Sequence, residues 1–370
     1  MKIPLIDLRA QYMELRTEID EAISRVLHSG VYIGGPEVEA FEQEITAVTG
    51  ANHAVSVGNG TDALLLALEA AGIGAGDEVV TTPFTFFATA ESIVRRGAIP
   101  VFADIDERTY NLSPEAAAAC ITPRTKAIMP VHLFGQPADM DAFRALADRH
   151  GLLLIEDACQ ALGAAYKGRP VGGTADISCI SFFPTKNLGG YGDGGIVVTG
   201  DAKLADRVHL LAHHGSRKKY FHETTGCNSR LDPLHAAVLR VKLAKLQEWN
   251  ERRRGIAAYY DRHLAGTGIV PPYASPDSRH VYHLYATQCP DRANVAAEMR
   301  KFGISTGHYY PCPLHLQEAL RGLGYRKGDF PVTERTCEHS LSLPISPQLP
   351  EEQQIYIMDK LHEVTGGSVS

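Results

Sequence analysis

A lysine and an aspartate follow two apolar stretches of the chain at positions that suggest chemistry. Lys186 lies just past the apolar run 177–182, and Asp157 ends the run 152–157, 29 residues before the lysine. Burial lowers the pKa of an ammonium group, and the neutral amine can attack a carbonyl carbon. In a site for pyridoxal phosphate (PLP), such an amine forms the Schiff base and a carboxylate keeps the pyridine nitrogen protonated. The alternative is that Lys186 is a solvated surface lysine, as most lysines are.

The segment 56–65 (SVGNGTDALL) carries a pattern that can bind a phosphate. Its Asn59-Gly60 turn follows an expected strand, and Thr61 and Asp62 open an Ala/Leu-rich helix. Backbone N–H groups at a helix start can donate to phosphate oxygens when small residues let the anion approach. The same pattern is also typical of a plain turn followed by a helix cap.

Two more features would complete a PLP site. The segment 83–89 (PFTFFAT) follows the expected strand 78–81, and a phenylalanine there could cover the pyridine ring, with core packing as the alternative. Gln160 follows Asp157 by three residues and could reach the phenolic oxygen of the cofactor, whereas helix capping is the alternative for the aspartate. The order of phosphate turn, aromatic residue, aspartate and lysine is far more specific than any one of these features.

Short β-rich runs alternate with Ala/Leu-rich helical stretches from about residue 53 to 200. The expected strands are 53–57, 78–81, 100–104, 126–131, 152–156, 177–182 and 195–199, and the expected helices include 62–73, 86–96, 114–121 and 138–150. This alternation predicts an α/β domain around a mainly parallel sheet, with the site at the carboxyl ends of the strands. One long helical pattern spans 231–265. It is expected to connect to a C-terminal part with short strands, prolines and one or two helices. We therefore expect an N-terminal arm and large PLP-binding domain at 1–250 and a smaller domain at 251–370.

The composition is that of an ordinary globular chain, because 44% of the 370 residues are hydrophobic and 21% are charged. The formal net charge of −7, without a long Lys/Arg block, argues against a nucleic-acid partner. The seven cysteines include no CxxC pair, which suits reduced thiols and argues against a disulfide framework or a metal site. No apolar run reaches the ~20 residues that span a bilayer. We expect a cytoplasmic protein with no membrane partner.

The chain resembles the DegT–DnrJ–StrS family of sugar aminotransferases over nearly its whole length. The resemblance rests on several motifs in the family's order: YIGGPEV at 32–38, NGTDAL at 59–64, EDACQ at 156–160, the segment 181–195, HG at 214–215, NSRLD at 228–232 and LSLP at 341–344. It implies an α/β protein of the fold-type I PLP aminotransferase class (aspartate aminotransferase-like), with a mainly parallel mixed sheet in the large domain and a smaller C-terminal α/β domain. It also implies a homodimer whose active sites are shared between the subunits.

Carried over by position, the resemblance implies roles for individual residues. Lys186 and Asp157 would be the catalytic pair, the first bound to PLP and the second paired with the pyridine nitrogen. The other cofactor ligands would be Phe86 on the ring, Gln160 near its hydroxyl, Gly60, Thr61 and Ser181 on the phosphate, and Asn228 reaching the phosphate of the partner subunit. Arg230 would lie beside Asn228, near the substrate.

One segment departs from the family pattern. The family often has Thr-x-x-His-Tyr-Pro in the C-terminal domain, whereas this chain has TGHYYP at 306–311. Counted back from Pro311, Tyr309 takes the usual position of the histidine, and His308 lies one residue earlier. A shift of one residue on an extended segment turns a side chain to the other face. Tyr309 is therefore the preferred substrate-binding candidate, ahead of His308.

The resemblance also implies the reaction. Relatives with histidine in place of Lys186 perform dehydration, so the lysine favours transamination. L-Glutamate would give its amino group, leaving 2-oxoglutarate and pyridoxamine phosphate (PMP), and a keto sugar linked to a nucleoside diphosphate would accept it to give an amino sugar. The segments 186–195, 238–243 and 249–254 are most like those of 3-aminotransferases, which favours a dTDP-linked 3-keto-6-deoxyhexose.

Three alternatives remain open at this point. A UDP-linked 3-keto-N-acetyl uronic acid is one, and Arg230 could bind its carboxylate. A keto-cyclitol is the second, because enzymes acting on such substrates share the motifs. A PLP-binding regulatory protein is the third, and the intact Lys186–Asp157 pair argues against it, because a sensor needs no group that stabilises a carbanion.

Overall fold

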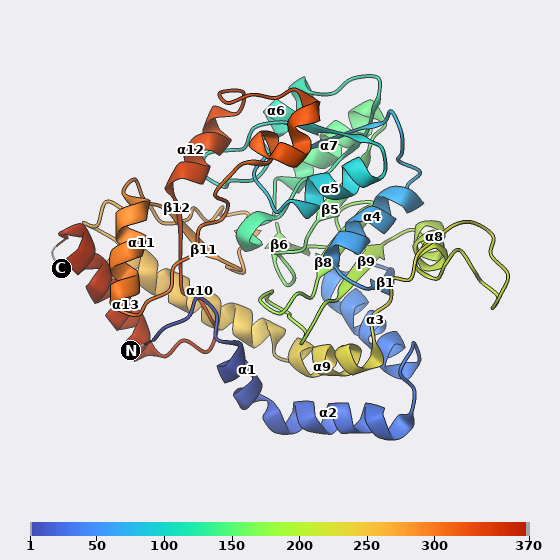
Figure 1. Cartoon of the computed structure of the whole chain (residues 1–370), viewed down its shortest axis with the longest axis horizontal. Coiled ribbons are helices and arrows are strands. Elements are labelled where there is room, and N and C mark those ends of the chain that lie inside the picture. Colours follow the sequence, from blue (N-terminus) through green and yellow to red (C-terminus); the bar gives the residue numbers. More distant parts are fainter. Residues whose placement is uncertain (1, 368–370) are drawn as a thin grey trace.

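The computed structural model describes residues 2–367, and a seven-stranded sheet forms its centre (Figure 1). In order across the sheet, the strands are β1 (His53–Val57), β9 (Gly195–Thr199), β8 (Ile177–Ser181), β5 (Leu153–Asp157), β4 (Thr125–Ile128), β2 (Glu78–Thr81) and β3 (Ile99–Phe102). From β8 to β3 all pairs are parallel, whereas β9 runs antiparallel to both β8 and β1. The predicted α/β fold with a mainly parallel mixed sheet is confirmed.

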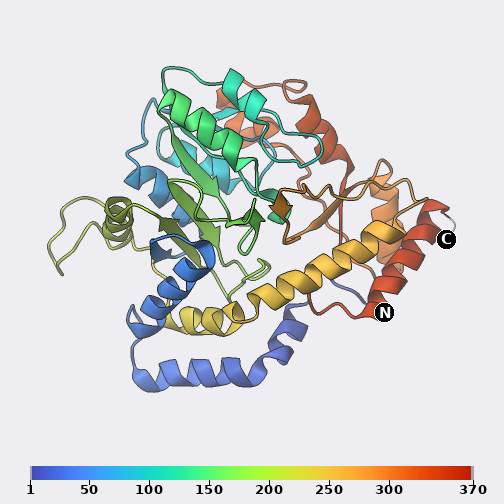
Figure 2. The same ribbon diagram turned by 180° about the vertical axis from the view of Figure 1, so that it is seen from behind.

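Helices cover both faces of this sheet, as Figures 1 and 2 show. On one face lie α4 (Gly60–Ala70), α5 (Ala88–Arg95) and α8 (Ala202–Ala212), and on the other lie α3 (Pro36–Thr49), α6 (Pro114–Ala119), α7 (Met140–His150) and α9 (Pro233–Leu243). Side chains alternate between the faces along each strand, so that Val79 packs into one core cluster and Val80 into another. This double burial explains why strands such as GIVVT in β9 are apolar almost throughout.

The C-terminal part of the chain forms a second core around α10 (Leu246–His263), α11 (Arg292–Lys301), α13 (Glu351–Thr365) and an antiparallel pair of strands, β11 (Tyr285–Gln288) and β12 (Ser340–Leu343). The N-terminal segment joins this core, because Ile3 is fully buried in it and pairs with Ile304. Smaller elements are α12 (Pro331–His339), the 3-10 turns Leu133–Gly135, Leu314–Leu316 and Glu318–Leu323, and the short strands β6 (Ala165–Tyr166), β7 (Arg169–Pro170) and β10 (Ser278–Arg279).

The single long helix expected at 231–265 is instead two helices, α9 and α10, which are separated at Ala244 and Lys245. The break lets each helix bury a different face. α9 packs under the sheet against α3 and α2 (Arg16–Ser29), which follows the short α1 (Leu8–Glu14). α10 places Leu246 in the large core and Tyr260 in the C-terminal core. The connecting role therefore falls to α10 alone, as Figure 2 shows.

The expected domain boundary at residue 250 lies inside α10 and stays a prediction. Within residues 2–367, none of the helices combines the length and apolar character needed to cross a bilayer.

Candidate active site

A cavity of about 950 Å³ opens where β2, β5 and β8 end. Its wall consists of the segments that follow these strands, the start of α4 and residues from the C-terminal part of the chain. The predicted site residues that line it are Gly60, Thr61, Phe86, Asp157, Gln160, Ser181, Lys186 and Tyr309. They meet because the carboxyl ends of parallel strands lie at one edge of the sheet.

The turn that carries Lys186 is tied to other parts of the chain. The backbone N–H of Lys186 donates to the carbonyl of Phe183 at 2.9 Å. The next residue, Asn187, donates from its side-chain amide to Asn250 Oδ1 at 2.7 Å and to the carbonyl of Val281 at 2.9 Å. The lysine is therefore held from α10 and from the segment before β11.

The electrostatic environment makes Lys186 a better nucleophile than an exposed lysine. Burial lowers the pKa of its amine, although Cys159 and Asp157 act in the opposite direction. Asp157 itself is only 5% exposed, and its two oxygens have separate donors. Thr89 Oγ1 donates to Oδ2 at 2.7 Å and the backbone N–H of Cys159 donates to Oδ1 at 3.2 Å, so the orientation of the carboxylate is fixed.

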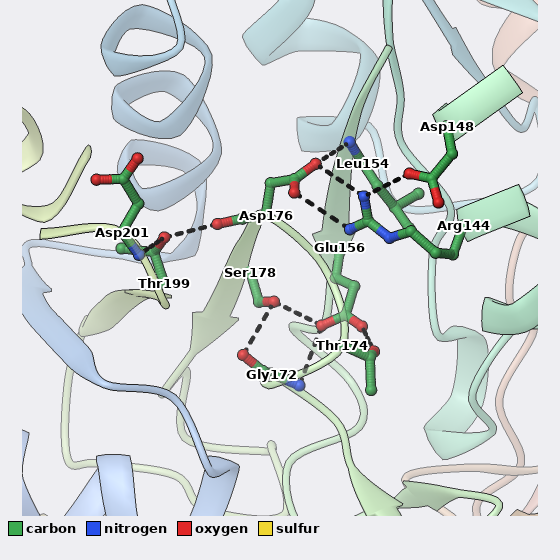
Figure 3. Close-up of polar contacts among 10 residues, drawn as sticks. All are labelled: Arg144, Asp148, Leu154, Glu156, Gly172, Thr174, Asp176, Ser178, Thr199 and Asp201. Atoms are coloured by element: carbon green, nitrogen blue, oxygen red, sulfur yellow. Dashed lines mark hydrogen bonds and ion pairs between the residues drawn. The ribbon is translucent and has the colours of Figure 1, made fainter. Parts of the chain in front are cut away.

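The residue before Asp157 anchors the end of β5 on the other face of the sheet. Glu156 is fully buried and accepts hydrogen bonds from the backbone N–H of Gly172 at 3.0 Å and from the hydroxyls of Ser178 and Thr174 (Figure 3). Burial would raise the pKa of Glu156, but His132, whose Nε2 lies 3.5 Å away, and the two hydroxyls hold it below its usual value. This network holds β5 against β8, and with it the backbone of Asp157.

The Asn59-Gly60 turn opens α4 as predicted. Asn59 caps the helix, because its side chain accepts a hydrogen bond from the N–H of Asp62 at 2.8 Å. A Cβ on Gly60 would lie 2.6 Å from the Cβ of Ser181 and 3.0 Å from its Oγ, so a side chain does not fit without movement. The glycine thus leaves the first N–H groups of the helix and the Ser181 hydroxyl open to one corner of the cavity, where an anion binds favourably.

Gln160 is held by two partners. Its Oε1 accepts a hydrogen bond from the backbone N–H of Phe134 at 3.0 Å, and its Nε2 donates to the hydroxyl of Tyr310 at 2.9 Å. Tyr310 lines the cavity beside Tyr309 and was not among the predicted site residues. Its only signal in the sequence was its place directly before Pro311 in the divergent segment.

Two more residues of the site were missed. Thr89 lies beneath Asp157, with its hydroxyl 3.0 Å from that of Thr85. Its signal in the sequence was the four-residue spacing of two threonines at a helix start. His283 lines the cavity, but it belongs to none of the motifs that identified the other residues.

Three predicted site residues do not line this cavity. His308 turns elsewhere, because its Nε2 lies 2.7 Å from the carbonyl oxygen of Cys337. Asn228 is exposed, and its backbone forms an antiparallel β-bridge with that of His213. Arg230 is partly buried just before α9. Between them, Ser229 accepts from the N–H of Gly58 at 2.9 Å, so the segment docks beside the phosphate turn of its own chain.

The residues present fit PLP. A partly buried amine and a fixed carboxylate lie in one cavity, and the cradle at Gly60 and Ser181 would be filled by any Cβ. Phe86 is 58% exposed at the cavity wall, where an aromatic face can cover a ring.

Comparison with known proteins agrees with this geometry. Residues 13–362 match the DegT/DnrJ/EryC1/StrS aminotransferase family. The dTDP-3-amino-3,4,6-trideoxy-alpha-D-glucose transaminase of Streptomyces venezuelae is 48% identical, over 98% of this chain and 96% of the relative. The UDP-2-acetamido-2-deoxy-3-oxo-D-glucuronate aminotransferase of Pseudomonas aeruginosa is 44% identical, over 94% and 96%. A protein of Geobacillus stearothermophilus named a pleiotropic regulatory protein is 48% identical, over 98% of each chain.

Solved structures show the same fold. The structure of Streptomyces venezuelae DesV in complex with a ketimine intermediate has a TM-score of 0.97 at 47% identity, covering 99% of each chain. That of NtdA from Bacillus subtilis with bound cofactor PMP has a TM-score of 0.92 at 32% identity, covering 99% of this chain and 85% of the other. The protein is a PLP-dependent aminotransferase, and the chain belongs to the DegT/DnrJ/EryC1/StrS aminotransferase family.

Proposed function

We propose that this enzyme transfers the amino group of L-glutamate to the keto group of a sugar linked to a nucleoside diphosphate, a dTDP-linked 3-keto-6-deoxyhexose. The observation that carries the reaction is that Lys186 and Asp157 line one cavity together with the cradle at Gly60. The 48% identity to the Streptomyces venezuelae transaminase over almost the whole of both chains supports the sugar.

Each residue of the cavity has a defined task in this proposal. Bound PLP supplies an electron sink for the carbanion formed at the substrate. Lys186, whose amine has a lowered pKa, would hold the cofactor through its neutral amine and, once free, would move the proton of the substrate carbon. Asp157, oriented by Thr89, would keep the pyridine nitrogen protonated. The helix start at Gly60 and the hydroxyl of Ser181 would hold the phosphate.

A homodimer with shared sites accounts for the residues outside the cavity. Asn228 and Arg230 do not line the cavity of their own chain, and Asn228 is exposed. At the cavity wall, Phe86 and Phe183 are 58% and 50% exposed, which is costly for phenylalanines unless a second surface covers them. In this proposal Asn228 reaches the phosphate of the partner subunit and Arg230 its substrate, with Tyr309 on the substrate side. The seven free cysteines suit a reducing cytoplasm.

The proposal is tested in two steps. The purified enzyme in its PLP form is mixed with L-glutamate, and both the visible absorbance of the bound cofactor and 2-oxoglutarate are measured. Loss of the absorbance with stoichiometric release of 2-oxoglutarate is expected. The PMP form is then offered a dTDP-linked 3-keto sugar, a UDP-linked 3-keto uronate and a keto-cyclitol in parallel. Failure of the first step would refute transamination, and turnover of only the second or third compound would refute the dTDP sugar.

A UDP-linked 3-keto uronate is the second candidate, because the Pseudomonas aeruginosa relative named for such a substrate is 44% identical. Arg230 would then pair with the uronate carboxylate. The regulatory name of the Geobacillus stearothermophilus relative suggests a third role, which the glutamate reaction separates from catalysis.

A further inference from the structure

The ring of His283 has no task in the mechanism above, although it lies in the cavity wall. Its side chain is only 6% exposed. Within residues 2–367, its Nδ1 is buried and has no hydrogen-bond partner. Buried polar atoms are almost always paired, so an unpaired Nδ1 on a residue at the edge of a cavity needs an explanation.

Lys186 lines the same cavity as His283, and two further observations relate them. The side chain of Asn187, the residue after the lysine, bonds to the carbonyl of Val281, two residues before the histidine, at 2.9 Å. Burial is the main cause that lowers the pKa of His283 well below its usual value, and the charge of Lys186 is the next, ahead of Arg253. The imidazole is therefore neutral, and it can accept a hydrogen bond through its unprotonated nitrogen.

The backbone around His283 is held in place at a cost. Tyr282 has a φ of 44°, in the left-handed region that residues other than glycine seldom adopt. Nη1 of the buried Arg253 donates to the carbonyls of Tyr282 at 3.2 Å, His283 at 3.5 Å and Ile345 at 2.9 Å. In the described part of the chain, Arg253 has no carboxylate within ion-pair distance. Strain of this kind persists where the surrounding structure enforces it, typically at functional sites.

We propose that His283 is a positioning residue for Lys186, whose amine donates a hydrogen bond to its neutral ring whenever that amine carries the extra proton. This assignment rests on the role proposed above for the lysine. When Lys186 has taken the proton of the substrate carbon, its ammonium group is buried away from water. Asp157 is already engaged by Thr89 and assigned to the pyridine nitrogen, and the imidazole is a neutral acceptor in the same cavity wall. The proton stays on the lysine, and the hydrogen bond keeps the amine directed into the cavity.

The other ionisable groups around the pair define what a titration would report. Those in the same cavity wall are Asp62, Glu91, Arg95, Asp157, Cys159, Asp193, Tyr309 and Tyr310, and Arg253 contacts the backbone carbonyl of His283. Burial raises the pKa of the Cys159 thiol and of the Tyr310 hydroxyl, so both stay neutral at physiological pH.

The test measures the lysine in the protein without PLP. Competitive acetylation with acetic anhydride, read by mass spectrometry across pH, gives the apparent pKa of the Lys186 amine. Loss of an acceptor disfavours the ammonium form, so His283→Leu is expected to lower that pKa by roughly 1–2 units. His283→Asn, whose amide oxygen can take the position of the Nδ1 acceptor, should restore most of the difference.

His280 offers a matched control two residues earlier. It is also buried, but its Nδ1 accepts the N–H of Tyr282 at 2.9 Å and it does not line the cavity. His280→Leu should leave the pKa of Lys186 unchanged. If His283→Leu does not fold, His283→Met, whose side chain carries no nitrogen or oxygen acceptor, replaces it.

An equal pKa of Lys186 in the wild type and His283→Leu would overturn the assignment, as would an equal shift in the His280 variant. Neither outcome bears on transamination, because no cofactor, glutamate or sugar is present in this measurement. Conversely, a wild type that releases no 2-oxoglutarate would refute the proposed function and leave the His283 measurement valid.

Discussion

Replacing Gly60 with alanine tests where the phosphate binds. The new Cβ would lie 2.6 Å from the Cβ of Ser181, about 0.8 Å inside the 3.4 Å at which ordinary contact begins, and 3.2 Å from the Sγ of Cys159. Because β8 ends at Ser181 and pairs with both of its neighbours, the strand cannot move away freely. The helix start of α4 must therefore shift, and with it the N–H groups that face the cavity.

The size of the effect follows from these contacts. Overpacking of this kind costs about 1–3 kcal/mol of folding free energy. Loss or misalignment of one charge-assisted hydrogen bond costs about 1.5–3 kcal/mol, so the affinity for PMP should fall roughly 10- to 100-fold. The affinity for PMP should fall by more than the loss of folding free energy alone would cause, because the phosphate needs the N–H groups of the helix start in one fixed position.

The assay is a titration of PMP into the cofactor-free protein, with thermal unfolding measured in parallel. Gly255→Ala is the control, because nothing lies within 4 Å of its added Cβ and its position is inside α10. That variant should bind PMP normally and be more stable by about 0.5–1 kcal/mol. If Gly60→Ala bound PMP within twofold of the wild type, the phosphate would not lie at this helix start.

Three further predictions follow from the site and its surroundings. Lys186→Ala should release no 2-oxoglutarate from glutamate but still bind PMP in a titration, and retained turnover would refute its role. Thr89→Val should weaken PMP binding roughly 3- to 10-fold by freeing the Asp157 carboxylate, with Thr89→Ser near wild type; equal affinity in both variants would contradict it. Lys242 is fully buried, donates to the carbonyl of Gly189 at 2.6 Å, and burial lowers its pKa to about 8. Because its folded pKa lies below the unfolded one, the unfolded chain binds more protons between these values, and stability gains from this group as pH rises from about 8 to 10.4. Denaturant unfolding of Lys242→Met should lack this gain, and parallel pH profiles would refute it.

Much of the fold could be predicted because it depends on local patterns. The seven strands of the main sheet were expected from short apolar runs, and their alternation with helices indicated a mainly parallel sheet. The prediction of a single helix at 231–265 was wrong. Helical periodicity continues across Ala244 and Lys245, while the buried face changes direction there. Only packing against the rest of the chain reveals such a change.

The candidate site divides in the same way. The chain order of Gly60, Asp157 and Lys186 could be recognised because each lies at or just past the end of a strand, and the carboxyl ends of parallel strands meet at one edge of the sheet. The segment 306–311 departs from the family pattern, and the sequence alone did not show which of its side chains face the cavity. Tyr309 lines the cavity as expected, and so does Tyr310, whereas His308 faces the carbonyl of Cys337.

The available chemistry can be read from the chain alone: a lysine, a carboxylate and a phosphate turn at the ends of strands of one α/β sheet. The tertiary structure alone decided which groups support them. Thr89 contacts Asp157 across 68 residues, and Gln160 contacts Tyr310 across 150. Periodicity and turn chemistry act over a few residues, so they can specify an element and its exposed ends. Contacts such as these, and the meeting of His283 and Lys186 in one cavity, arise only when separate elements pack, and no local pattern records them.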